Sequence, residues 1–140
     1  MLDHDASREA FGLAGYVRAV AAAVAVPWSD AAWEVGDHPA AYLALPARCV
    51  DHPGRDLILI WSSRRGWKLC MESTLHDPPA VVARLGTQVV PAPAEVESFV
   101  GEVLAGRRKG GRSAPSLPKE GPGLTELLSG YAVGREAPRL

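Results

Sequence analysis

Residues 57–73, with the sequence LILIWSSRRGWKLCMES, decide the fold. Two apolar runs rich in strand-forming residues flank a short polar turn, which is the pattern of a β-hairpin. Gly66 suits the left-handed position of a three-residue loop formed by Arg64, Arg65 and Gly66. This loop predicts the pairs Ser63 with Trp67, Trp61 with Leu69, and Leu59 with Met71.

The predicted hairpin has two different faces, because successive side chains of a strand point to opposite sides of the sheet. One face is strongly apolar and carries Leu57, Leu59, Trp61, Trp67, Leu69 and Met71. The other face mixes apolar and polar residues and carries Ile58, Ile60, Ser62, Lys68, Cys70 and Glu72. We therefore expect helices to cover the first face.

Further strand-like stretches lie on both sides of the hairpin, separated by turn residues. Their connections are shorter than the dozen or more residues that a parallel crossover needs, so neighbouring strands should be antiparallel. The sequence therefore predicts a five-stranded meander at Ala32–Val35, Ala41–Leu45, Leu57–Ser62, Trp67–Ser73 and Val81–Leu85.

Two amphipathic helices flank the meander. Residues 9–26 place Leu13, Val17, Val20, Ala21 and Val24 on one stripe, and Pro27 should end this helix. Residues 93–105 place Val96, Phe99, Val100, Val103 and Leu104 on one stripe, with Pro93 at the first helical position. The predicted fold class is α+β, a two-layer sandwich of a helix, the antiparallel meander and a helix over residues 7–106.

Charge and composition change at residue 107. Residues 1–106 hold 8 Lys and Arg against 13 Asp and Glu, whereas residues 107–140 hold 7 against 3 and are rich in Pro and Gly. Such a segment buries too little apolar surface to offset the entropy lost on ordering. We expect a flexible, mostly disordered basic tail over 107–140, with a short helix at 124–131.

Composition also restricts the classes of partner and the cellular compartment that we expect. The net charge of -1 gives no global attraction to nucleic acid or to an anionic membrane. Cys49 and Cys70 have no metal-type spacing, which is typical of reduced thiols in a cytoplasmic protein. The longest apolar stretch, Ala19 to Pro27, is about half of a membrane span, and the first residues are too acidic for a secretory signal. We expect no contact with membranes.

Four histidines lie beside aspartates, at Asp3-His4, Asp37-His38, Asp51-His52 and His76-Asp77. These residue types can bind metals, but they are also turn residues and fall where turns are expected. Successive turns of a meander alternate between the two ends of the sheet, so at most two histidines converge. We predict no metal site and no cofactor.

The chain contains no recognised catalytic motif, such as a nucleophile elbow, a phosphate loop, a dinucleotide fingerprint or a zincin motif. Cys70 lies in the middle of a strand, and no sequence motif places a base beside it. We therefore predict no catalytic residue, although catalytic groups far apart in the sequence would escape this test.

Three groups of residues are candidates for binding. The second sheet face would present Tyr42, Ile58, Ile60, Cys70 and Val82, with Lys68, Glu72 and Arg84 as a polar rim. In the tail, Leu124, Leu127, Leu128 and Tyr131 have helical spacing and would fold either in a partner's groove or against their own domain. The basic residues Arg107, Arg108, Lys109 and Arg112 would give weak nucleic-acid binding.

These features favour a non-enzymatic protein-interaction module, an accessory or regulatory protein. It would bind a partner protein or a second copy of itself through the second sheet face and the tail. Two alternatives remain: a nucleic-acid-associated regulator that uses the basic tail, and an enzyme with an unrecognised site. Apolar association should survive raised salt, whereas phosphate binding should weaken steeply.

Several segments together resemble a domain-of-unknown-function family of actinomycete proteins. They are Gly15–Ala21, Ala41–Leu45, Arg55–Trp61, Gly66-Trp67 and Val90–Pro93, and the resemblance covers about residues 10–105. It implies a small intracellular bacterial domain and brings no activity, cofactor or catalytic residue. The predicted shape is also loosely similar to secretion-chaperone-like and related peptide-binding domains, which is an analogy of fold alone.

Overall fold

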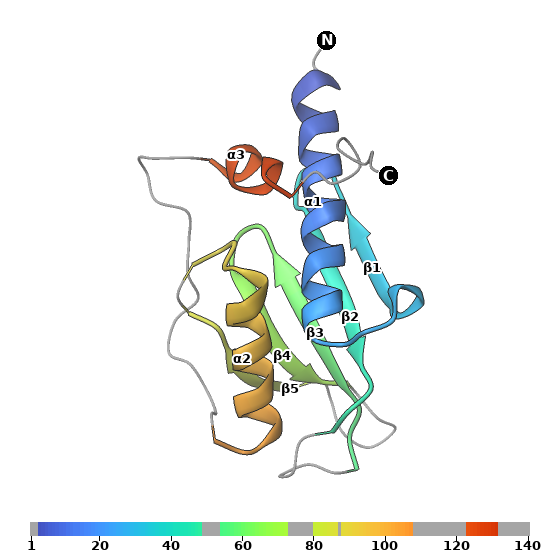
Figure 1. The fold of residues 1–140 in the computed structure, drawn as a ribbon, viewed down its shortest axis with the longest axis vertical. Coiled ribbons are helices and arrows are strands. Elements are labelled where there is room, and N and C mark those ends of the chain that lie inside the picture. Colours follow the sequence, from blue (N-terminus) through green and yellow to red (C-terminus); the bar gives the residue numbers. More distant parts are fainter. Residues whose placement is uncertain (1–2, 49–53, 73–79, 87, 108–122, 132–140) are drawn as a thin grey trace.

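A computed structural model describes residues 3–48, 54–72, 80–86, 88–107 and 123–131. The elements in chain order are α1 (Asp3–Ala23), the 3-10 turn η1 (Trp28–Asp30), β1 (Ala31–Glu34), β2 (Ala40–Leu45), β3 (Leu57–Ser62), β4 (Gly66–Met71), β5 (Ala80–Arg84), α2 (Pro93–Leu104) and α3 (Leu124–Ser129). The five strands form one antiparallel sheet in sequence order, with the helices on one side of it (Figure 1). The predicted α+β class is confirmed.

The β3–β4 hairpin keeps a three-residue loop, but its register differs from the prediction by two residues. Ser62 pairs with Gly66, and Trp61 pairs with Trp67. The predicted pairs Ser63 with Trp67, Trp61 with Leu69, and Leu59 with Met71 are wrong, because Gly66 begins β4 at a φ of 70° instead of ending the loop. A shift of two residues leaves every side chain on its predicted face.

The pairing of β4 with β5 contains a β-bulge. Leu69 lies opposite Ala83, but the next residue of β4, Cys70, lies opposite Val81. One extra residue, Val82, is therefore inserted into β5. The bulge interrupts the alternation of side chains. Odd and even residue numbers therefore do not assign the residues of β5 to the two sheet faces.

Helix α1 starts earlier and ends earlier than the predicted range 9–26. Its end is a Schellman motif, in which the Val26 N–H donates to the Ala21 carbonyl at 2.8 Å. Ala25 provides the left-handed residue at a φ of 60°, a conformation that costs an alanine about 1–2 kcal/mol. The motif, and not the following proline, therefore sets the end of α1.

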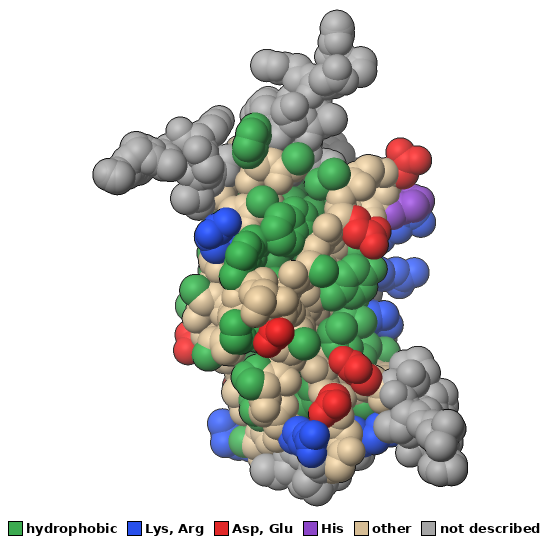
Figure 2. All heavy atoms as spheres, turned by 90° about the vertical axis from the view of Figure 1, so that its right-hand side faces the viewer, with side chains coloured by type: hydrophobic (Ala, Val, Ile, Leu, Met, Phe, Trp, Pro, Cys, Tyr) green, Lys and Arg blue, Asp and Glu red, His purple; other side chains and the backbone are tan. Residues whose placement is uncertain are grey.

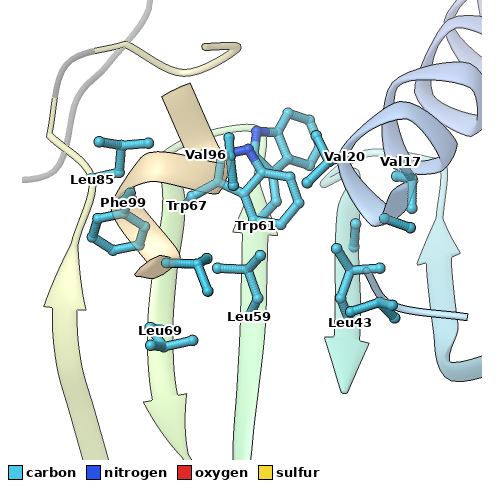
Figure 3. Packing of buried hydrophobic residues seen from close by; sticks show 14 of the residues in the cluster. Val17, Val20, Leu43, Leu59, Trp61, Trp67, Leu69, Leu85, Val96 and Phe99 are labelled. Carbon is cyan, nitrogen blue, oxygen red and sulfur yellow. The ribbon is translucent and has the colours of Figure 1, made fainter. Parts of the chain in front are cut away.

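The core lies between the helices and the more apolar sheet face, which we call the inner face. Its large strand residues Leu59, Trp61, Trp67 and Leu69 are fully buried. Val17 and Val20 from α1, and Val96 and Phe99 from α2, pack against the same layer (Figure 3). The sequence prediction that both helices cover this face agrees with the structure.

Tyr16 links α1 to the two core tryptophans, although the predicted stripe of α1 did not include it. Its hydroxyl donates a hydrogen bond to the Pro91 carbonyl at 2.5 Å and accepts one from Trp67 Nε1 at 3.0 Å. Trp61 Nε1 donates to the Val89 carbonyl at 2.7 Å. These bonds fix the segment before α2 to the core and leave no indole or phenol group of this cluster unsatisfied.

Helix α3 packs against α1. Leu128 is fully buried, and the Tyr131 ring lies 4.8 Å from the Tyr16 ring. The two helices approach so closely that a Cβ on Gly12 would lie 2.6 Å from the Leu128 carbonyl oxygen. The sequence allowed this segment to fold either in a partner's groove or against its own domain, and the structure shows the second arrangement.

Candidate functional site

The sheet face opposite the helices, which we call the outer face, holds four of the five residues predicted for it, Tyr42, Ile58, Ile60 and Cys70. Tyr42, Ile60, Lys68 and Arg84 are successive cross-strand partners in one row. Ala44, Ile58, Cys70 and Val81 form the neighbouring row. None of the described helices packs on this face, because α1, α2 and α3 all lie on the inner side (Figure 1).

A shallow hollow of about 440 Å³ occupies the β3–β4–β5 part of this face. We call it the outer hollow. Its lining residues are Ile58, Ile60, Lys68, Cys70, Met71, Glu72, Ala80 and Val81. The predicted residues Ile58, Ile60 and Cys70 therefore converge on one depression, and Tyr42 lies beside it in the row of Ile60.

Val82 is not among the residues that line the outer hollow. It is half-buried and packs against the core residues, whereas Val81 lines the hollow and is 45% exposed. The prediction of Val82 at this surface is corrected by one residue. The physical reason is the bulge, which sets Val81 instead of Val82 opposite Cys70.

Cys70 forms part of the floor of the outer hollow and is only 6% exposed. Burial raises the pKa of its thiol, and the nearby charges of Lys68 and Arg84 offset part of this increase. A raised pKa keeps the sulfur protonated, and the thiolate is the reactive form of cysteine. In its protonated form Cys70 contributes apolar surface to the floor of the hollow.

Lys68 and Arg84 are direct cross-strand partners on β4 and β5. The first lines the hollow itself, and both act on the Cys70 thiol. Figure 2 looks onto the β1 edge and shows Lys and Arg side chains projecting along the margin formed by the outer face. The site thus combines an apolar floor with a pair of cations.

The tail residues have mixed outcomes. Leu128 is fully buried in the core beside α1, which is the second of the two arrangements that the sequence left open for this segment. The tail helix buries it because the helix has too few residues to be stable alone. The other three members of that set, Leu124, Leu127 and Tyr131, are partly buried on the same core.

The basic candidates are covered only in part. Arg107 is exposed just after α2. Arg108, Lys109 and Arg112 lie outside the described residues, as do Cys49, His52 and His76. His38 is exposed in the turn between β1 and β2. In the part of the chain that the structure describes, no three His, Cys, Asp or Glu residues are grouped as a metal would require.

An aromatic cluster beside the β1 edge was not predicted. The rings of Trp28 and Trp33 lie 4.8 Å apart, and the Arg18 guanidinium lies 4.5 Å from the centre of the Trp28 ring. Among the residues whose burial the structure describes, Phe11 on α1 and Val35 after β1 are the most exposed large apolar ones, at 53% and 50%. Hydrophobic side chains are visible over this side of the molecule in Figure 2. None of these residues lines the outer hollow.

Among the described residues, no helix has both the length and the apolar character needed to cross a membrane.

Comparison with known proteins gives a family but no activity. No curated protein and no solved structure matches the chain. A family of unknown function, DUF6292, matches residues 16–102. The matched range holds the five strands, Tyr16 and most of α2, and it excludes Gly12 and α3. Because the match spans more than half of the sequence, the chain belongs to the DUF6292 family, a family of unknown function.

Proposed function

We propose that this protein is a non-enzymatic interaction module that binds another protein through the outer face of its sheet. The observation that carries the proposal is the outer hollow, where Ile58, Ile60 and Val81 offer apolar surface that no described element of the chain covers. Contiguous apolar surface of this kind is typical of binding sites in soluble proteins.

The chemistry of the hollow supports binding over catalysis. Its titratable side chains are Lys68, Glu72 and Cys70, and the raised pKa of the thiol favours the unreactive form. The hollow is shallow and open, whereas an active site normally surrounds its substrate with converging polar groups. We also place the protein in the cytoplasm, where Cys70 would stay reduced.

The test compares one substitution on the outer face with one elsewhere. Three proteins are compared: the full-length chain, an Ile60→Ser variant and a Phe11→Ser variant. Each serves as bait to capture a bound protein, and light scattering measures its molar mass to detect self-association. We expect the Ile60 variant alone to lose its bound protein or its self-association. Phe11 is the control because it is exposed and apolar but lies on α1.

Two results would contradict this proposal. Equal behaviour of all three proteins would remove the outer face from any interaction. Loss of binding by the Phe11 variant alone would move the interface to the exposed side of α1. A partner that stays bound at raised salt indicates apolar association. Loss of binding at raised salt indicates the nucleic-acid alternative, since phosphate binding weakens steeply with salt.

A further inference from the structure

The pairing of Lys68 with Arg84 gives the outer hollow an electrostatic preference. The two residues are directly opposite on β4 and β5. Like charges directly opposite each other destabilise a sheet. Within the described residues, neither cation has an ion pair with a carboxylate. The sheet therefore holds two adjacent positive charges that no described group of the chain neutralises.

Glu72 also lines the hollow, but it follows the last residue of β4 and is too far from Lys68 to neutralise the two cations. It lies four residues beyond Lys68, which corresponds to roughly 13 Å in a strand. The cation pair and Glu72 therefore lie at different ends of the hollow, with the apolar floor of Ile58, Cys70 and Val81 between them. The Arg55 guanidinium also lies beside Glu72, since it donates a hydrogen bond to the Glu72 backbone carbonyl at 2.7 Å.

We infer that the outer hollow binds a segment of a partner protein that carries an acidic side chain next to apolar ones. The carboxylate lies between Lys68 and Arg84, and the apolar side chains cover Ile58 and Val81. This inference rests on the proposed function and names the chemistry of the partner. A charge-assisted contact in a partly desolvated hollow is stronger than the same contact in water.

A second copy of this chain fits the hollow less well. Related copies in a two-fold dimer present the same surface to each other. Centred on the hollow, such a dimer would bring four cations together, two from each Lys68 and Arg84 pair. An acidic segment instead reduces the repulsion between Lys68 and Arg84, whereas a second copy would add two more cations.

The experiment measures the binding of two fluorescein-labelled nine-residue peptides to the full-length chain by fluorescence anisotropy. One peptide alternates valine with aspartate, and the other alternates valine with lysine. We expect the acidic peptide to bind at least tenfold more tightly, and its affinity to fall as salt is raised.

Charge reversal supplies the decisive variant. Lys68→Glu combined with Arg84→Glu keeps a like-charged pair, so its stability should be close to that of the parent, and it should prefer the lysine peptide. Arg64→Glu combined with Arg65→Glu makes the same change in net charge on the exposed hairpin loop. This control should keep the preference for the acidic peptide.

The outcomes separate the inference from the proposed function. If both peptides bind equally and Ile60→Ser weakens both, the charge preference is wrong but the interaction surface stands. If neither peptide binds and Ile60→Ser dissociates a dimer seen by light scattering, the occupant is a second copy and the inference is wrong. If neither peptide binds and Ile60→Ser changes no interaction, the inference and the proposed function both fail.

Discussion

The inner and outer faces of the sheet come from the same strands and alternate residue by residue. On β3, Leu57, Leu59 and Trp61 are fully buried, whereas their neighbours Ile58 and Ile60 are only half-buried. Both sets are apolar, so hydrophobicity alone does not say which is covered. The difference comes from the helices, all of which lie on the inner side. Inner residues should therefore report on stability, and outer residues should report on binding.

The largest expected effect compares Leu59→Ala with Ile60→Ala. Leu59 is fully buried, so its truncation should lower the free energy of unfolding by about 2–5 kcal/mol. Ile60 is half-buried on the outer face, and its truncation should cost roughly 1 kcal/mol. Denaturant unfolding monitored by tryptophan fluorescence measures both. Equal losses would mean that the outer face is covered as fully as the inner one.

The next effect tests the contact between α1 and α3. Gly12→Ala places a methyl group against the Leu128 carbonyl, so it should displace α3 and lower stability by about 1–3 kcal/mol. Gly101→Ala is the matched control in α2, where nothing lies within 4 Å of the new Cβ. It should raise stability by roughly 0.5–1 kcal/mol.

Amide hydrogen exchange distinguishes displacement of α3 from general destabilisation. In Gly12→Ala, protection should fall first over Leu124–Ser129. Unchanged protection there, together with unchanged stability, would show that α3 does not hold the position that the close approach requires.

The third effect concerns pH and the inner face. Burial raises the pKa of Tyr16 above its ordinary value of about 10, so the unfolded chain releases this proton first as the pH rises. The contribution of Tyr16 to the free energy of unfolding is fully present below pH 10 and is lost as the pH rises further. Above pH 10 the free energy of unfolding should fall with a slope that approaches about 1.4 kcal/mol per pH unit.

Unfolding measured between pH 8 and pH 11 tests this dependence. Tyr16→Phe should remove this part of the slope, and it should lower stability at neutral pH because Trp67 and Pro91 lose their hydrogen-bond partner. Tyr42→Phe, which changes the outer face instead, is the control. A slope that persists in Tyr16→Phe would assign it to another group.

The smallest effect has the opposite sign. Lys68→Glu replaces a repulsive cross-strand pair with an attractive one, so it should raise the free energy of unfolding by about 0.2–1 kcal/mol. The same variant should bind the acidic peptide less tightly. A variant that gains stability while losing binding would show that Lys68 is kept for recognition. Loss of stability would mean that Lys68 has a structural role in the sheet.

Strong periodicity made the fold predictable. The alternation over β3 and β4 assigned the two faces correctly even though the register was wrong by two residues. The face depends only on whether a residue number is odd or even, so an even shift has no consequence for burial. The helical stripe of α2 was similarly clear, and its four buried residues are all members of the predicted stripe.

The details of the site were less predictable. Ile58, Ile60 and Cys70 were found by alternation, but Val82 was chosen in place of Val81 because a bulge leaves no mark in local sequence. Tyr16 was missed because its role depends on Trp67 and Pro91, which are distant in the sequence. Its spacing from Leu13 and Val20 was the one available signal.

The sequence by itself determined the order of the main helices and strands, the antiparallel arrangement of the sheet and which residues of β3 and β4 share a face. These properties follow from local periodicity and from connections too short for crossovers. Only the tertiary structure decided which apolar residues stay accessible. Accessibility depends on where the helices lie and on contacts between distant residues, such as Gly12 with Leu128 and Lys68 with Arg84. Local sequence cannot encode those contacts, because each of them needs the whole chain folded to exist.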